Sequence, residues 1–501
     1  MTTLKYLRVS TNQRTYLTVL FNFIKHSSLT FVVAALLATP VESADIKLPT
    51  MGDTSSGIIS QQQEHELGRA WLRAYRSRIK EYNDPLLSDY LEQLLYRLVS
   101  HSALEDRRLE LITINNPSMN AFAVPGGVIG IHTGLFLYAK SEDQLSSVLA
   151  HEIAHLSQRH FARRVEAQKN TTAASLAGML ASLVLAATVG GDAGLAGLTA
   201  TQAASQHSLL KYSRQNEQEA DRFGLQTMTD AGMDPKAMSS MFEEMLRITR
   251  YTGSRVPEFL LTHPLTENRV ADARNRINQL PPKHYQDNLE FHLMRVRALI
   301  AIDNNPSVSL NRFQHELKGN TLHGEAARYG VTLAYLALGN YAKAEESIDV
   351  LLKTSPDRLT YQMADIDIDR DQGRFDLAIN KTKQLLNYRS DSYPLRMSLA
   401  ETYLKSNRYL ESEQVLDTLA LSHPNDPEVW FQLAETRGLA GNISGVHKAR
   451  AQYFILNGVF DQARDQLGYA RKLLANDYKQ TAIIDQQLKD LAQLEKKMES
   501  F

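Results

Sequence analysis

The amino-acid sequence predicts a mostly helical α+β domain with a small sheet, followed by an all-α repeat domain. Three observations support this fold class. Short β-rich runs around a turn signal lie within residues 109–131, a helical pattern with two histidines and a glutamate follows at 151–155, and a 34-residue period runs through the C-terminal half. We expect three segments: 1–44 as an export signal, 45–280 as the α+β domain and 285–490 as the repeat domain.

Composition excludes several classes of protein. The chain has 501 residues, and 55 Lys and Arg against 56 Asp and Glu give a formal net charge of -1, which provides no basic field for nucleic acid. It contains no cysteine, which excludes disulfides, thiolate metal sites and cysteine nucleophiles. Histidines and carboxylates therefore remain as the strong ligands for a transition metal.

The N-terminal 44 residues have the features of an export signal. A cationic stretch ends at Lys25, an apolar run covers 29–38, and small residues follow. We expect cleavage near Ser43 or Ala44, which would place the mature protein in a bacterial periplasm. The apolar run is shorter than the roughly 20 residues that a spanning helix needs, which disfavours the alternative of a retained membrane anchor.

Secondary-structure patterns lead from N-terminal helices to a sheet. Residues 61–100 repeat apolar side chains at helical spacing. The runs 109–114 and 121–124 are β-rich, and the turn signal 125–127 leads into a third run at 128–131. These runs predict a small antiparallel sheet in front of the histidine motif.

The helix that carries the motif is expected to begin at Ser141, because Ser141 and Gln144 match a capping box. His151 and His155 are four residues apart, so both imidazoles lie on one helix face and can bind a single ion. Glu152 lies beside them, where its carboxylate can take a proton from a metal-bound water and deliver it to a leaving amine. The pattern predicts a zinc peptidase site with Glu152 as general base.

A third protein ligand is expected from a later helix. Glu217 supplies a carboxylate that, with two histidines, leaves one coordination position open for water. Asp221 lies one turn further along, where it either accepts the ring N–H of a ligating histidine or acts as a proton relay. Glu219 is the competing ligand. We predict one Zn²⁺ per chain, held by His151, His155 and Glu217.

Two further segments are expected near the site. The apolar stretch 176–189 predicts a buried or surface-lying helical hairpin, with contact to lipid as the alternative. The segment 256–264 contains two prolines and is expected to loop back over the cleft. His263 in this segment has three open interpretations: it stabilises the oxyanion of the tetrahedral intermediate, it occupies the open zinc position in an inactive state, or it packs in the loop beside Pro264.

The strand that contains Phe122 is expected to be an edge strand that pairs with an extended peptide, because a peptidase must hold its substrate backbone straight. His132, close to this strand, is expected to be a structural polar residue.

The C-terminal half repeats with a period of 34 residues. Gly339, Gly373, Asn407 and Gly441 hold the same position in four copies, each followed two residues later by an aromatic residue or isoleucine. This period and spacing are the signature of helix-turn-helix tetratricopeptide repeats, which stack and usually bind other proteins. Gly458 repeats the local pattern at half the period, so the boundaries after about residue 440 stay open.

The combination of motifs resembles a known peptidase family. His-Glu-x-x-His at 151–155 followed by Glu-x-x-Ala-Asp at 217–221 is similar to the gluzincin metallopeptidases, which include the CAAX-prenyl endopeptidases and the HtpX-type membrane proteases. The similarity extends to Asn-Ala-Phe-Ala-Val-Pro-Gly-Gly at 120–127 and to Thr-His-Pro at 262–264 with Arg269.

This resemblance covers roughly residues 60–280 and implies a zincin-like metallopeptidase domain with the three zinc ligands named above. It also implies that Glu152 is the catalytic acid/base and that Asp221 is a supporting catalytic residue. The integral-membrane relatives have several spanning helices. This sequence has no convincing one, so a prenyl-protein substrate within the membrane is not expected.

Together with the export signal and the repeats, the resemblance implies a zinc-dependent endopeptidase of the cell envelope that degrades misfolded or misassembled outer-membrane β-barrel proteins and promotes their assembly. The expected partners of the repeat domain are those unfolded proteins and their assembly machinery, with peripheral membrane contact left open and nucleic acid excluded. The main alternative is a chaperone or adaptor that acts through the repeat domain with low proteolytic activity. A zinc-stabilised scaffold without catalysis is a third class.

Overall fold

The computed structural model describes residues 59–167, 213–251, 257–319 and 323–499. The expected export signal and the apolar stretch 176–189 lie outside these residues. Within the described part of the chain, no helix is long and apolar enough to cross a membrane.

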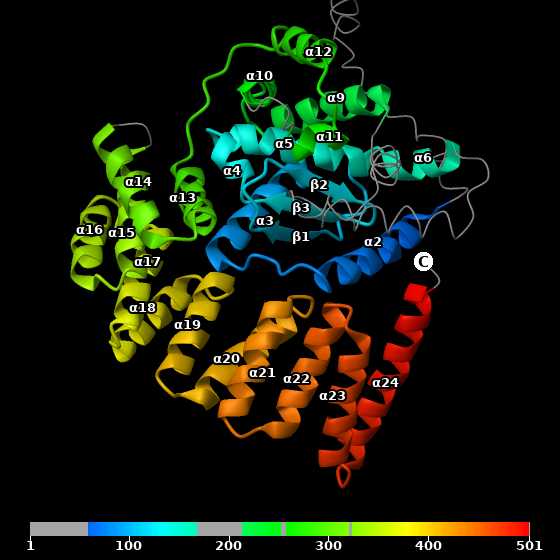
Figure 1. Ribbon diagram of the computed structural model, residues 1–501, viewed down its shortest axis with the longest axis vertical. Coiled ribbons are helices and arrows are strands. Elements are labelled where there is room, and N and C mark those ends of the chain that lie inside the picture. Colours follow the sequence, from blue (N-terminus) through cyan, green and yellow to red (C-terminus); the bar gives the residue numbers. More distant parts are fainter. Residues whose placement is uncertain (1–58, 168–212, 252–256, 320–322, 500–501) are drawn as a thin grey trace, which may run out of the picture. The chain divides into compact units, whose positions relative to one another are not determined.

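The α+β domain combines helices with one small sheet (Figure 1). In chain order its elements are α2 (Gln61–Arg76), α3 (Pro85–Ser100), β1 (Glu110–Ile114), β2 (Ala121–Val124), β3 (Val128–His132), α4 (Leu135–Tyr138), α5 (Glu142–Ser157), α6 (His160–Ala167), α9 (Arg214–Asp230), α10 (Lys236–Tyr251), α11 (Glu258–Thr262) and α12 (Glu267–Ile277).

Polar caps begin the helices that frame the site. Ser60 caps α2 in a complete capping box, in which the Ser60 side chain accepts from Gln63 N and the Gln63 side chain accepts from Ser60 N. Ser141 caps α5 as predicted, with its Oγ accepting from Gln144 N at 3.3 Å. The Gln144 side chain accepts from Lys140 N at 2.7 Å instead of from Ser141 N, so the predicted start of α5 is confirmed but only half of the capping box forms.

The sheet is mixed, and the prediction of an antiparallel sheet is wrong for one of its two strand pairs. The strand order is β1-β3-β2, with β2 antiparallel and β1 parallel to β3. The turn at 125–127 joins β2 and β3 in a hairpin, and β3 then takes the central place next to β1. Strand-like patterns locate strands but carry no information on which strand becomes central.

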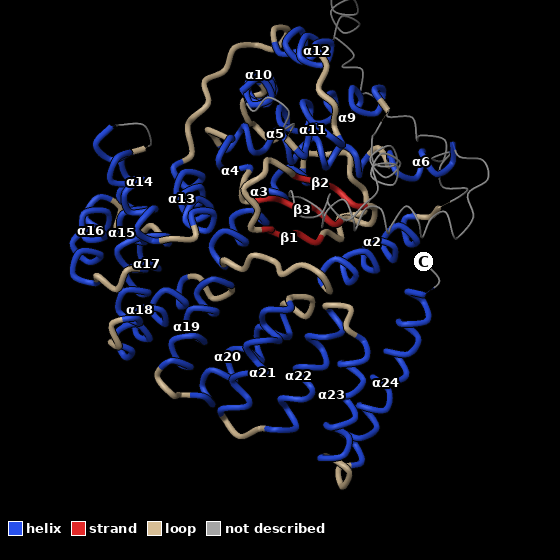
Figure 2. Tube along the Cα trace, viewed as in Figure 1, coloured by secondary structure: helices blue, strands red, loops and turns tan. Residues whose placement is uncertain are grey.

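Helices cover both faces of the sheet. Val124 and Val128 pack with Trp71 of α2 in one cluster of buried residues, whereas Ile129 and Ile131 belong to the larger core that includes α3 and α5. This alternation follows from the two-residue period of a strand. Figure 2 shows the three strands between α2 and α5, so the sheet supports the helix that carries the histidine motif.

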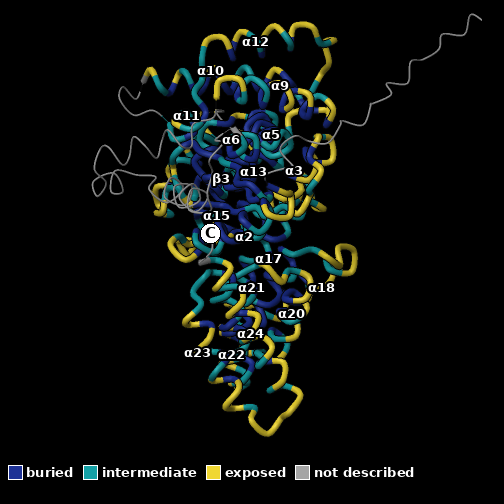
Figure 3. The backbone as a smooth tube through the Cα atoms, turned by 90° about the vertical axis from the view of Figure 1, so that its right-hand side faces the viewer, coloured by how far each residue is buried: buried dark blue, intermediate teal, exposed yellow. Residues whose placement is uncertain are grey.

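The repeat domain is helical throughout the residues that the structure describes. Figure 3 shows buried residues along the helix contacts and exposed residues at many of the connecting turns. Its helices are α13 (Leu289–Asp303), α14 (Pro306–Gly319), α15 (Gly324–Ala337), α16 (Tyr341–Thr354), α17 (Leu359–Asp371), α18 (Phe375–Tyr388), α19 (Tyr393–Lys405), α20 (Tyr409–Ser422), α21 (Pro427–Leu439), α22 (Ile443–Leu456), α23 (Phe460–Leu473) and α24 (Tyr478–Glu499).

The backbone confirms the 34-residue period. At the turn between paired helices, φ is 69° at Gly339, 79° at Gly373, 59° at Asn407 and 80° at Gly441. Asparagine adopts this left-handed conformation more readily than most non-glycine residues, which explains why it can replace glycine in the third copy. Gly458, which repeats the pattern at half the period, has φ 68°. It makes a similar turn between the neighbouring helices α22 and α23.

Gly373 and Gly468 allow a matched test of this turn. A Cβ would meet nothing within 4 Å at either position, but only Gly373 has a left-handed backbone, whereas Gly468 lies inside α23. We expect Gly373→Ala to lower the free energy of unfolding by about 1–2 kcal/mol. Gly468→Ala should raise it by about 0.5–1 kcal/mol. Urea unfolding followed by circular dichroism measures both changes, and equal effects would contradict the turn assignment.

Candidate metal centre

Helix α5 carries both histidines of the motif on its buried face. His151 and His155 are each 3% exposed, and their Nε2 atoms lie 3.0 Å apart. Glu152 is 1% exposed. The spacing of four residues therefore brings the two imidazoles together as the sequence predicted, with the glutamate next to them.

Helix α9 brings the predicted third ligand into the same space. Glu217 Oε2 lies 3.5 Å from His151 Nε2, and Glu217 Oε1 lies 3.5 Å from His155 Nε2. The two helices approach closely because Gly224 on α9 faces the α5 backbone, where a Cβ would lie 3.2 Å from the carbonyl oxygen of Ala150. An isolated glycine inside a helical pattern is the sequence signal for such packing.

The segment after residue 256 returns over the site, as predicted for its described residues 257–264. It forms the short helix α11, and His263 follows with 2% of its surface exposed. His263 Nδ1 lies 3.3 Å from His151 Nε2 and 3.1 Å from Glu217 Oε1, and its Nε2 lies 3.5 Å from Glu152 Oε1. The ring also stacks on Phe259 at 4.7 Å between ring centroids. His263 therefore contacts the two helices that supply the predicted ligands.

Four side chains form a group that could hold a metal ion. One potential ligand atom each from His151, His155, Glu217 and His263 lies within 4.8 Å of the other three. Glu217 Oε2 and Glu152 Oε1 are buried acceptors without a well-aligned hydrogen bond. Glu217 Oε2 is, however, at ion-pair distance from Arg269. Imidazoles and a carboxylate are donors that suit zinc and related transition metals, so the residues present fit such an ion.

Asp221 and Arg269 lie directly behind the group. Asp221 Oδ1 is 3.0 Å from His151 Nδ1, the ring nitrogen that faces away from the other ligands. Arg269 approaches two of the carboxylates of α9, with its Nε 2.7 Å from Asp221 Oδ2 and its Nη1 2.8 Å from Glu217 Oε2. Arg269 belonged to the family resemblance, but its spacing in the sequence did not indicate that it would pair with these two carboxylates.

The competing ligand Glu219 lies outside this group. Its Oε2 is 3.1 Å from His160 Nε2 and 2.6 Å from Arg163 Nη2 on α6. His160 was not singled out from the sequence, although the structure places it beside His155. The only available signal was a further histidine five residues after the motif, at the end of the helical pattern.

Burial and nearby charges shape the acid–base properties of the group. Burial raises the pKa of Glu152, against the effect of the neighbouring histidines. Burial also raises the intrinsic pKa of Asp221, but the hydrogen bonds from Arg269 and His151 outweigh this effect and leave its pKa below the ordinary value. The two carboxylates therefore differ: Asp221 is held charged, and Glu152 takes up a proton more readily.

Strand β2 lies at the edge of the sheet beside the site. It pairs with β3 on one side, and Phe259 N of α11 donates to Met119 O just before the strand at 3.2 Å. Phe122 packs against Trp71 with ring centroids 5.6 Å apart. His132 is 1% exposed and bonds through Nδ1 to Ser118 Oγ at 2.8 Å, which fits the expected structural role.

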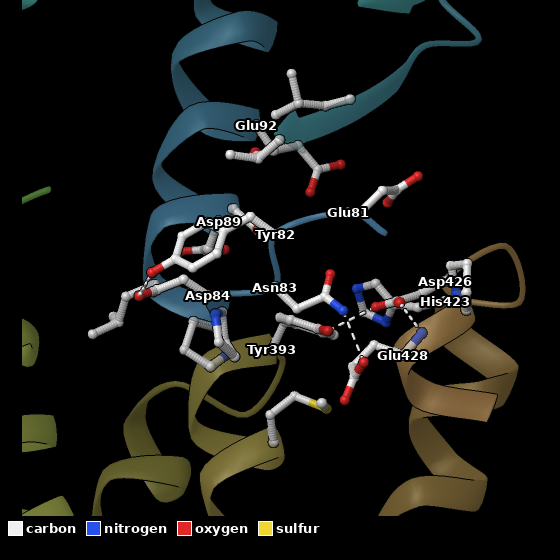
Figure 4. A pocket seen from close by; sticks show the side chains of 18 of the residues that line it. Glu81, Tyr82, Asn83, Asp84, Asp89, Glu92, Tyr393, His423, Asp426 and Glu428 are labelled. Carbon is white, nitrogen blue, oxygen red and sulfur yellow. Dashed lines mark hydrogen bonds between the residues drawn. The ribbon is translucent and has the colours of Figure 1, made fainter. Parts of the chain in front are cut away.

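A separate cavity of about 630 Å³ lies between the α+β domain and the repeats (Figure 4). Asn83 Nδ2 donates to Glu428 Oε2 at 2.8 Å, so the two domains meet in its wall. On the repeat side of the wall, the Tyr393 hydroxyl donates to Asp426 Oδ2 at 2.7 Å. The cavity contains none of the predicted metal or catalytic residues. Its other labelled acidic residues are Glu81, Asp84, Asp89 and Glu92.

Comparison with known proteins identifies both parts of the chain. Residues 85–277 match the model of peptidase family M48, and residues 369–434 match a tetratricopeptide repeat model. The first range contains the complete group around His151 and His155. The second range lies within the helical region with the 34-residue period.

Several known proteins are similar in sequence to this chain. A beta-barrel assembly-enhancing protease of Escherichia coli is 35% identical over 488 residues, which covers 96% of this chain and 99% of the relative. A protein of the same name from Yersinia pestis is 33% identical, over 83% of this chain and 85% of the relative. A mitochondrial metalloendopeptidase of Schizosaccharomyces pombe is 34% identical over 39% of this chain and 57% of that protein. The chain therefore belongs to peptidase family M48, a metallopeptidase family, and joins its peptidase domain to tetratricopeptide repeats.

Proposed function

We propose that this chain is a zinc-dependent endopeptidase of the cell envelope, which degrades misfolded or misassembled outer-membrane β-barrel proteins and promotes their assembly. The observation that carries the proposal is the group of His151, His155, Glu217 and His263, with potential ligand atoms within 4.8 Å of one another. Glu152, a buried carboxylate, lies beside this group.

Zinc is the metal that we assign to the site. The chain has no cysteine, and two imidazoles with one carboxylate are a common ligand set for a catalytic zinc ion. We assign His151, His155 and Glu217 as the ligands of one ion per chain. When bound, zinc supplies a Lewis acid and lowers the pKa of a bound water to about 7.

Glu152 is the proposed general base and acid. It accepts a proton from the attacking water and delivers that proton to the leaving amine. Burial raises the pKa of Glu152, which makes its carboxylate a better proton acceptor than an exposed glutamate. The site thus provides a base within 3.5 Å of the His263 ring.

Asp221 and Arg269 are proposed to position the ligands. Asp221 Oδ1 lies 3.0 Å from His151 Nδ1, at ion-pair distance but not aligned as a hydrogen bond. A proton on Nδ1 would face this carboxylate and leave the lone pair of Nε2 for a metal. This contact favours the tautomer-fixing role of Asp221 over a proton relay. Arg269 compensates the charge of the Asp221 and Glu217 carboxylates, which are buried and would otherwise repel each other.

His263 is proposed to hold the open coordination position in a resting state. Its Nδ1 lies 3.1 Å from Glu217 Oε1 and 3.3 Å from His151 Nε2. A histidine that only packed in the loop would not need to approach these two side chains so closely. A substrate carbonyl would have to displace this ring. Oxyanion stabilisation by His263 after displacement is the alternative, and substitution separates the two roles.

The repeat domain is proposed to bind substrates and partners. Phe431, Leu439 and Tyr469 are 49%, 53% and 48% exposed and line a groove along α21, α22 and α23, which offers apolar contacts to an unfolded chain. The names of the full-length relatives, together with the export signal expected from the sequence, support envelope proteins as substrates and a periplasmic location.

Replacement of Glu152 by Gln tests the peptidase proposal. Glutamine keeps the size of the side chain but cannot accept the proton, so we expect E152Q to lower kcat for casein cleavage by about 10²–10⁴-fold with unchanged zinc content. The exposed Glu267 on α12 provides the control, since Glu267→Gln should leave kcat unchanged. If E152Q cells assemble and clear outer-membrane proteins as wild-type cells do, the chaperone alternative is correct and proteolysis is not the primary role.

Replacement of Glu217 by Ala tests the third ligand. Loss of one of three protein ligands should remove zinc from the purified protein, which atomic emission measures as metal content per chain. Asp230→Ala removes an exposed carboxylate from the same helix and should leave zinc content at the wild-type value. Full zinc content in E217A would show that another group is the third ligand.

Replacement of His263 by Ala separates its proposed roles. If His263 blocks the open position, H263A should cleave casein faster than the wild type at the same zinc content, because substrate no longer competes with the ring. If His263 instead stabilises the transition state, kcat should fall by about 10²–10³-fold. A fall of that size would overturn the resting-state role.

A further inference from the structure

His160 lies behind the metal centre and has no part in the chemistry described above. It is the first residue of α6 and has no exposed surface. Its Nδ1 lies 2.8 Å from Nδ1 of His155, at hydrogen-bond distance. The other nitrogen of His155, Nε2, faces His151 and Glu217 at 3.0 and 3.5 Å. His155 therefore contacts the ligand group with one ring nitrogen and His160 with the other.

The second nitrogen of His160 is also engaged. His160 Nε2 lies 3.1 Å from Glu219 Oε2. Arg163, one turn further along α6, holds both oxygens of this carboxylate, with Nη1 3.2 Å from Oε1 and Nη2 2.6 Å from Oε2. A chain of contacts thus runs from His155 through His160 to Glu219 and ends on an arginine.

If both imidazoles are neutral, the hydrogen bonds from His155 through His160 to Glu219 can run in only one direction. If His155 Nε2 offers its lone pair to a metal, the proton of His155 must be on Nδ1. The only acceptor that His160 can offer at that contact is an unprotonated Nδ1. The proton of a neutral His160 is then on Nε2, where it donates to the Glu219 carboxylate. Each of the two ring N–H groups then has an acceptor, and the lone pair of His155 Nε2 is directed to the ligand group.

The turn between α5 and α6 places His160 in this position. Arg159 has φ 48°, a left-handed conformation that is unfavourable for a non-glycine residue. Its guanidinium is held by Glu64 Oε2 at 2.9 Å and by the carbonyl oxygen of Ile59 at 2.5 Å. The conformation at Arg159 ends α5 and starts α6 so that the His160 ring faces back onto His155.

We propose that His160, anchored by Glu219, is a positioning residue that fixes the tautomer and ring orientation of His155 for metal binding. The inference rests on the proposed zinc site and gives its second histidine a support that parallels the contact of His151 with Asp221. It assigns Glu219 a role in the site although the carboxylate lies outside the ligand group. Outer partners of this kind contribute to metal affinity without touching the metal.

Replacement of His160 by Leu and by Asn tests the proposal in the full chain. Leucine removes the acceptor, so H160L should weaken zinc affinity by about 10–100-fold, measured by competition with a chromophoric chelator. Asparagine can place its amide oxygen near the position of Nδ1, so H160N should bind zinc less than about 10-fold more weakly than the wild type. The visible spectrum of the Co²⁺-loaded protein should change in H160L and stay closer to the wild type in H160N.

Two further variants guard against a loss of folding. His292 in α13 is 7% exposed and pairs with Asp287 at 2.6 Å, so His292→Leu makes the same chemical change at a buried histidine outside the site and should leave zinc affinity unchanged. The Glu219 side chain is 31% exposed, so Glu219→Ala should fold and still weaken zinc affinity by about 10-fold, at the lower end of the range for such partners.

The outcomes separate this inference from the proposed function. If the wild type binds zinc tightly and H160L and E219A bind it equally well, His160 does not position His155 and the inference is wrong while the zinc site stands. Equal losses in H160L, H160N and H292L would also overturn it, because they would reflect packing alone. A wild-type chain that binds no zinc would contradict the proposed function itself.

Discussion

The close packing of α5 against α9 is the constraint on which the metal centre depends. It brings one carboxylate, Glu217, within 3.5 Å of two imidazoles, and all three side chains are buried. Such a concentration of buried acidic and basic groups is costly unless each charge is paired. Gly224 permits the approach of the two backbones, and Arg269 pairs with Glu217 and Asp221 of α9, so the geometry of the site depends on residues outside the ligand group.

The two histidines of the motif are supported from opposite sides. His151 is backed by the carboxylate of Asp221, and His155 is backed by the imidazole of His160. In both cases an arginine ends the chain of contacts, which keeps the outer carboxylate charged and in place. The ring orientations are thereby set by the protein before a metal or substrate is bound, which is the general requirement for a preorganised catalytic site.

The sequence predicted those features that depend on local patterns. The four-residue spacing of His151 and His155, the cap at Ser141 and the repeat turns at Gly373 and Asn407 all follow from the geometry of one helix or one turn. The central place of β3 and the pairing of Arg269 with α9 depend on how distant segments pack, which spacing does not encode. His160 was missed because its position depends on the left-handed backbone of Arg159, which few non-glycine residues adopt.

We propose that one zinc ion is held between α5 and α9. The decisive experiment is X-ray diffraction from crystals of the purified full chain, recorded on both sides of the zinc absorption edge. We expect a single anomalous peak enclosed by His151, His155 and Glu217. Zinc bound elsewhere, or no peak in this position after loading with zinc, would contradict it and leave the tetratricopeptide repeats as the active part of the molecule.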